Sequence, residues 1–61
     1  MKIKYIVNNY MLGAKVRSTQ TEKIISQKKI DKNKTELVYD FINMKEKEFC
    51  DRVLSKKGIV I

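Results

Sequence analysis

Residues 35–58, which decide the expected fold, read TELVYDFINMKEKEFCDRVLSKKG. In the first part of this stretch, residues 35–43, large apolar residues recur at every second position, and the other face carries Glu36, Val38, Asp40 and Ile42. Leu37, Tyr39 and Phe41 lie on one side of an extended chain, which is the period of a half-buried strand. The stretch therefore begins with a strand that buries one face.

The second part predicts a helix that begins after Asn43. The side chain of Asn43 can cap the first turn, and Glu46 stands at the third position of a capping box. Lys56 and Lys57 lie in the last expected turn, where the negative end of the helix dipole favours cations. Gly58 is expected to end the helix. Four apolar residues recur at helical spacing and predict one buried stripe, namely Phe49, Cys50, Val53 and Leu54.

Upstream, residues 2–8 also alternate and predict a first strand. The pair Asn8-Asn9 tolerates left-handed backbone angles, so a turn is expected there, with Gly13 closing the connection. A second strand is expected from Ala14. Residues expected to face the core from these two strands are Ile3, Tyr5, Val7 and Val16.

The segment Ser18–Ile30 allows two interpretations. Thr19 and Glu22 match a capping box that would begin a helix. No helical apolar stripe follows, however, and the β-branched residues fit a strand. We favour an extended segment, bent or bulged, that ends in a turn at residues 31–34.

These elements predict a single small domain, residues 1–61, in the order β-β-β-α-β. The fold class is α+β, a small antiparallel sheet of three to four strands with one C-terminal helix packed on one face. Residues 59–61 form the last strand, which should pair beside the first strand or across the two-fold axis of a homodimer, because a bare apolar edge invites aggregation. The expected core is Ile3, Tyr5, Val7, Val16, Leu37, Tyr39, Phe41, Phe49, Val53 and Leu54.

The composition argues against catalysis. The chain has no His, the usual acid–base residue near neutral pH, and a single Cys. Cys50 has no His partner and is expected to be a small buried hydrophobe rather than a nucleophile. We expect no enzyme activity, no cofactor and no metal site.

Similar features of the sequence indicate the cellular compartment of the protein. One unpaired Cys and the lack of a signal peptide favour a reducing, cytoplasmic setting. No apolar stretch approaches the ~20 residues that a membrane span needs, so no membrane partner is expected. The abundance of Lys, Ile and Asn suits an AT-rich genome, such as that of a low-GC bacterium or its phages.

All of the net charge of +7 lies before Glu36. Nine basic residues up to Thr35 face only Glu22 and Asp31, whereas five basic and five acidic residues balance from Glu36 onward. An unbalanced basic half favours an anionic partner, such as DNA, RNA or an acidic protein surface.

The candidate nucleic-acid-binding residues lie on the expected first hairpin and in the turn after it. In the hairpin they would project from the sheet face opposite the core and contact phosphates. The contrary interpretation is that Glu36 and Asp40 pair with some of these lysines across strands. The candidates are Lys2, Lys4, Lys15, Arg17, Lys28, Lys29, Lys32 and Lys34.

Twelve lysines against two arginines favour phosphate contacts without much sequence preference. Stacking on single strands needs exposed aromatic rings, and the basic half has only Tyr5 and Tyr10. Two functions remain open. The first is a small basic nucleic-acid-binding accessory protein of a phage or mobile element. The second is a protein-binding regulator or inhibitor that docks its basic face on an acidic host protein.

At the level of topology, a three-stranded sheet followed by a helix resembles the arm-type DNA-binding domains of some phage and transposon integrases. The run Phe41–Glu46, which ends a strand and caps a helix, is similar in kind to the strand-to-helix junction of those domains. The resemblance is a fold-level analogy. With no catalytic domain present, integrase activity is not expected.

Overall fold

Four antiparallel strands form one sheet in the order β2-β3-β1-β4. The computed structural model describes residues 1–61. The strands are β1 (Lys2–Asn8), β2 (Ile24–Lys29), β3 (Lys34–Asp40) and β4 (Ile59–Val60). This confirms the predicted fold class, with the last strand paired beside the first in the same sheet.

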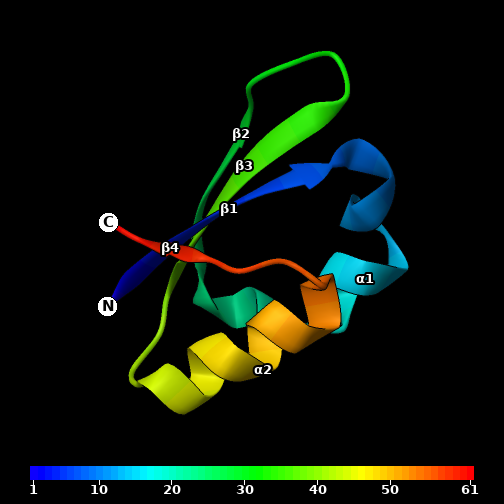
Figure 1. The fold of residues 1–61 in the computed structure, drawn as a ribbon. Helices are drawn as coiled ribbons and strands as arrows, with labels where there is room; N and C mark the ends of the chain where they lie inside the picture. The colour runs from blue at the N-terminus through cyan, green and yellow to red at the C-terminus, as the bar shows by residue number, and fades with distance from the viewer.

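The order of the strands requires two crossovers. β1 and β2 both run antiparallel to β3, and β3 and β4 both run antiparallel to β1. Each of the pairs β1/β2 and β3/β4 is therefore parallel, and a parallel pair needs a long connection. The connections are helical and cover the same face of the sheet (Figure 1). The resulting β-α-β-β-α-β order is the split, ferredoxin-like arrangement.

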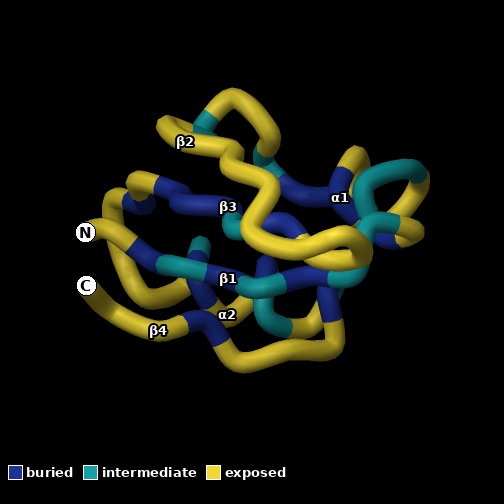
Figure 2. Tube along the Cα trace, turned by 90° about the horizontal axis from the view of Figure 1, so that it is seen from above, coloured by how far each residue is buried: buried dark blue, intermediate teal, exposed yellow.

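The core lies between the sheet and this helical layer. Successive side chains of a strand point to opposite faces, so alternate residues of β1 are buried while their neighbours are only partly covered (Figure 2). Ile3 pairs with Tyr39 and Tyr5 with Leu37 across the two central strands. Tyr39 packs edge-on against Tyr5, with ring centroids 5.5 Å apart, and stacks on Phe41 at 5.0 Å.

The second strand predicted from Ala14 is wrong. The chain instead forms a 3-10 turn, η1 (Asn9–Leu12), followed by the short helix α1 (Ala14–Arg17). This segment is part of the crossover between the parallel strands β1 and β2, so it has no strand partner. Met11 and Val16 are buried in the core from these two turns. The three consecutive strands on which the similarity to integrase arm domains depended therefore do not occur.

The extended interpretation of the segment before the turn is confirmed in its second half. A 3-10 turn, η2 (Thr21–Lys23), leads into β2, and the register of β2 against β3 shifts between Ile24 and Ser26, as a bulge would cause. The predicted turn closes the β2–β3 hairpin, where the Ile30 amide donates to the Lys34 carbonyl at 3.1 Å.

Helix α2 (Met44–Leu54) begins as predicted and ends differently. The Asn43 side chain accepts a hydrogen bond from the Glu46 amide at 3.1 Å, which confirms the cap. The prediction that Gly58 ends the helix is wrong, because Ser55 does so in a left-handed conformation with φ 53°. Gly58 is instead buried beside β1.

The predicted apolar stripe of α2 is partly wrong. Cys50 and Leu54 are buried, but Phe49 is 42% exposed and Val53 is half-buried. Lys47 is only 4% exposed and occupies a position on the buried face. The helix is rotated relative to the expected one because Lys47 forms an ion pair beneath the sheet, which helical spacing does not reveal.

Phe49→Ala should accordingly leave the domain folded. The apolar contribution scales with the area removed from water, so a side chain this exposed should cost about 1–2 kcal/mol, less than a fully buried Phe. A thermal melt followed by circular dichroism should remain cooperative with a modestly lowered midpoint. Loss of the transition would show that Phe49 belongs to the core after all.

Strand β4 forms one edge of the sheet and ends in an apolar tail. Ile59 and Val60 pair with β1, and the Ile61 amide donates to the Lys2 carbonyl at 3.0 Å. All three side chains remain more than half exposed. Association of two copies along this edge stays a prediction. No helix has the length and apolar content needed to cross a lipid bilayer.

Candidate nucleic-acid interface

The face of the sheet that no helix covers carries four of the predicted basic residues. Alternation places Lys2 and Lys4 of β1 on this open face, opposite the buried Ile3 and Tyr5. The cross-strand register brings two more to it: Lys28 opposes Glu36, and Lys34 opposes Asn8. The open face therefore brings together lysines from three strands, β1, β2 and β3.

The other predicted residues of the hairpin extend this basic surface around its tip. Lys29 opposes the buried Thr35, so it points to the helical side of the sheet. Lys32 lies in the turn itself, and both lysines are exposed. The hairpin projects beyond the helical layer (Figure 1), so its tip presents charge on both sides.

Asn9, the first residue of η1, holds this turn in place. The Asn9 amide donates to the Asn33 carbonyl at 2.8 Å, and the Asn9 side-chain nitrogen donates to the Lys32 carbonyl at 3.2 Å. The Thr35 hydroxyl donates to the Asn9 side-chain oxygen at 2.7 Å. The basic tip is therefore anchored to the body of the domain by an asparagine that the sequence suggested only as a turn residue.

Lys15 and Arg17 do not join this surface. The sequence placed them beside Lys2 and Lys4 on one face of a hairpin, and this prediction is wrong because residues 14–17 form α1. Both side chains are exposed on the helical layer, whereas Lys2 and Lys4 lie on the open face. The predicted set is thus divided between the two layers.

None of the eight predicted residues forms an ion pair. The acidic partners proposed for them are engaged elsewhere or stand alone: the Asp40 carboxylate accepts from the N-terminal ammonium of Met1 at 3.1 Å, and Glu36 has no cationic nitrogen within 4.0 Å. The interpretation that Glu36 and Asp40 neutralise these lysines is therefore not supported. The ammonium groups remain available to an external anion.

The open face offers no aromatic ring to a base. Domains that bind single-stranded RNA on a four-stranded sheet stack bases on aromatic side chains of the sheet surface. Here Tyr5 and Tyr39 point into the core, and the only strongly exposed tyrosine is Tyr10 in η1, at 79%. Charge and shape are what this face can present.

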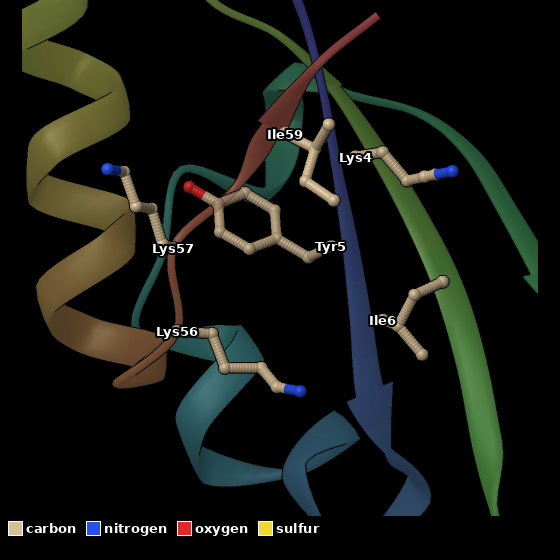
Figure 3. A pocket seen from close by; sticks show the side chains of 6 residues that line it. All are labelled: Lys4, Tyr5, Ile6, Lys56, Lys57 and Ile59. Carbon is tan, nitrogen blue, oxygen red and sulfur yellow. The ribbon is translucent and has the colours of Figure 1, made fainter.

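A shallow pocket of about 220 Å³ lies beside this face, between β1 and the segment that joins α2 to β4. Figure 3 shows Tyr5 and Ile59 on one side of it and Ile6 on the other. Two lysines that were not among the predicted site residues, Lys56 and Lys57, line it together with Lys4. Their spacing along the chain gave no signal, because only the pairing of β4 with β1 brings residues 56–57 next to residue 4.

Behind the pocket, Asp51 collects donors from three elements. Its carboxylate accepts from the Tyr5 hydroxyl at 2.5 Å, the Lys47 ammonium at 2.7 Å and the Gly58 amide at 3.0 Å. Burial raises the pKa of this carboxyl, but the hydrogen bonds from Lys47, Tyr5 and Gly58 outweigh it, so the pKa lies below its ordinary value of 3.8. Burial likewise raises the pKa of the Tyr5 phenol, and the bond to Asp51 adds to this. The cluster is an internal brace, with its charges paired.

Cys50 lies in the core next to this brace, which confirms its predicted burial. Burial raises the pKa of its thiol above the ordinary value of 9.0. A thiol that stays protonated near neutral pH is a poor nucleophile. Its environment is that of a packing residue.

No protein-family model, curated protein or solved structure shows significant similarity to the chain.

Proposed function

We propose that the protein binds nucleic acid electrostatically, through the β2–β3 hairpin and the adjoining open face of the sheet. The observation that carries the proposal is the freedom of the basic side chains: none of the six predicted lysines of the hairpin and open face is paired with a carboxylate, and all except the half-buried Lys4 are exposed. When unpaired lysines neutralise phosphates, the counterions condensed on the nucleic acid are released. This release is the main source of non-specific affinity.

The shape of the hairpin suits this role. A two-stranded ribbon fits the major groove of B-form DNA or lies along a backbone. The tip carries Lys28, Lys29, Lys32 and Lys34 against Asp31 alone. Because lysine is a compact point charge without the bidentate geometry of arginine, we expect little sequence preference.

A second function, docking on an acidic protein, is favoured by a different observation. Ile25 and Ile30 flank the lysines of β2 and are about half exposed, at 53% and 47%. Apolar side chains interspersed with lysines suit a protein partner better than a phosphate backbone. The salt dependence of DNA binding separates the two functions.

The test compares the parent with a variant in which Lys28, Lys29, Lys32 and Lys34 are all replaced by Gln. The parent should bind a duplex of arbitrary sequence with micromolar affinity at low salt and lose about 100-fold between 50 and 200 mM salt, as about four phosphate contacts require. The variant should lose nearly all of this salt dependence, because each phosphate contact contributes about 0.9 to the log–log slope. Fluorescence anisotropy over a salt series measures both.

A matched control removes the same charge from the helical layer. Lys15, Arg17, Lys45 and Arg52 are exposed there, and their replacement by Gln also lowers the net charge by four. This variant should keep most of the salt dependence of DNA binding. Equal losses in both variants would show that only net charge matters, and no DNA binding by the parent at 50 mM salt would favour the acidic protein partner.

A further inference from the structure

The segment that joins α2 to β4 leaves part of one edge of β1 unpaired, although β3 pairs with the other edge throughout, and this gap coincides with the pocket. β4 pairs with β1 only at Ile3 and Lys4. The next residue along β1 on the same face, Ile6, lines the pocket, where the opposite wall is formed by Lys56 and Lys57. The sheet edge is therefore open at one point, with lysines around it.

The backbone of Ile6 faces this opening. Along β1, the Met1 carbonyl accepts a bond from Phe41 on the β3 side, and the Lys2 carbonyl accepts one from Ile61 on the β4 side. Because amide and carbonyl directions alternate along a strand, the peptide groups of even-numbered residues point toward β4. No backbone or side-chain group partners Ile6 on that side. An unpaired N–H at a sheet edge is a donor for an anion.

Two of the three lysines can serve an anion at the Ile6 amide, because each has a flexible four-carbon stem. In Figure 3 the Lys56 ammonium lies between the C-terminal segment and β1, whereas the Lys4 side chain extends across β1 toward β3, on the side where Ile6 lies. Lys57 extends the other way, toward α2. Neither Lys4 nor Lys56 is paired with a carboxylate.

We propose that this pocket binds a phosphate group of the nucleic acid, held by the Ile6 amide and the ammonium groups of Lys4 and Lys56. The identity of the ligand rests on the proposed function. A volume of about 220 Å³ holds one such group and part of its sugar, against Ile59, rather than a whole cofactor. Since Lys4 also belongs to the open face, the pocket lies at the border of the proposed nucleic-acid interface.

The experiment titrates the ¹⁵N-labelled protein with inorganic phosphate at constant ionic strength, with chloride as the reference anion. The Ile6 amide resonance should shift and saturate with a dissociation constant on the order of 1–10 mM, which is reasonable for a small ion with a few contacts. The amide of Lys45, on the exposed side of α2, serves as the remote reference. A shift that stays linear or that chloride reproduces would overturn the proposal.

Three single variants make the test specific. Lys4→Gln and Lys56→Gln should each weaken phosphate binding about fivefold, the effect of one exposed charge contact. Lys57→Gln is the matched control and should change it little. Glu36 opposes Ile6 on β3, so Glu36→Gln should strengthen binding by removing the nearest carboxylate of the open face. If Lys57→Gln weakened phosphate binding as much as the other two substitutions, the affinity would depend only on the overall positive charge near the pocket. That result would contradict the proposal.

A 5′-phosphorylated oligonucleotide, compared with its unphosphorylated form, separates this inference from the proposed function. If phosphate saturates the pocket while neither oligonucleotide binds, the pocket stands and the nucleic-acid function fails. If the oligonucleotides bind without moving the Ile6 resonance, the function stands and the pocket fails. A larger Ile6 shift with the phosphorylated form assigns the pocket to a strand end, and equal shifts assign it to an internal phosphate.

Discussion

Gly58→Ala should remove most of the stability of the domain. A methyl group at this position would lie 2.6 Å from Tyr5 Cζ and closer still to Ile3 Cγ2. Neither neighbour can move easily, because Tyr5 is held by Tyr39 on one side and by its hydrogen bond to Asp51 on the other. Overpacking of this kind costs about 1–3 kcal/mol or more, while a domain of this size has only about 3–5 kcal/mol in total.

Urea unfolding followed by circular dichroism would measure the loss. Gly13→Ala is the control, since an added methyl group there has no heavy atom within 4 Å. Its midpoint should fall by much less than that of Gly58→Ala. A Gly58→Ala protein with a midpoint close to the parent's would mean that Gly58 is not tightly packed against Ile3 and Tyr5.

Asp51→Asn should have an effect of similar size through charge rather than volume. The substitution keeps the shape of the side chain but leaves the Lys47 ammonium, whose side chain is only 5% exposed, without its anionic partner. Removing one member of a buried pair typically costs about 3–5 kcal/mol, because the remaining charge is buried and uncompensated. Chemical unfolding near pH 7 should show this loss.

Two further variants test the cause. Asp40→Asn removes a carboxylate that is 53% exposed and paired with the N-terminus, so it should cost at most about 1 kcal/mol. Adding Lys47→Met to Asp51→Asn removes the stranded charge and should recover part of the loss, which a double-mutant cycle would register as coupling. Strictly additive effects would contradict a direct interaction between the two side chains.

The same pair predicts the response to acid. The pKa of Asp51 in the folded protein lies below its ordinary value of 3.8, so the folded state binds this proton less readily than the unfolded chain does. The stabilisation from Asp51 is therefore complete above about pH 4 to 5 and is lost as the pH falls toward the folded-state pKa. The Asp51→Asn protein should lose less stability than the parent over this acid range.

Local patterns in the sequence were sufficient for β1, β3 and β4, one helix start and most of the core. Alternation over residues 2–8 and 35–41 depends only on the period of an extended chain, and it identified Ile3, Tyr5 and Leu37 as inward-facing. The cap at Asn43 needs only the residues of one helical turn. The turn before β3 likewise follows from a local cluster of polar residues.

Other features depended on which strands become neighbours. Residues 14–17 form a helix because β1 and β2 are parallel and need a crossover, and no local signal announces that relation. Phe49 is exposed because α2 turns Lys47 inward to meet Asp51, a pair whose stability depends on the Tyr5 hydroxyl and the Gly58 amide.

The candidate site shows the same division. Composition identified the basic half of the chain, because charge is a sum over residues and requires no structure. Its distribution over two layers, and the meeting of Lys4 with Lys56 beside the unpaired amide of Ile6, required the pairing of β4 with β1. Contacts between residues more than 50 positions apart are set by the tertiary fold, since no pattern with a local period can encode which distant residues will meet.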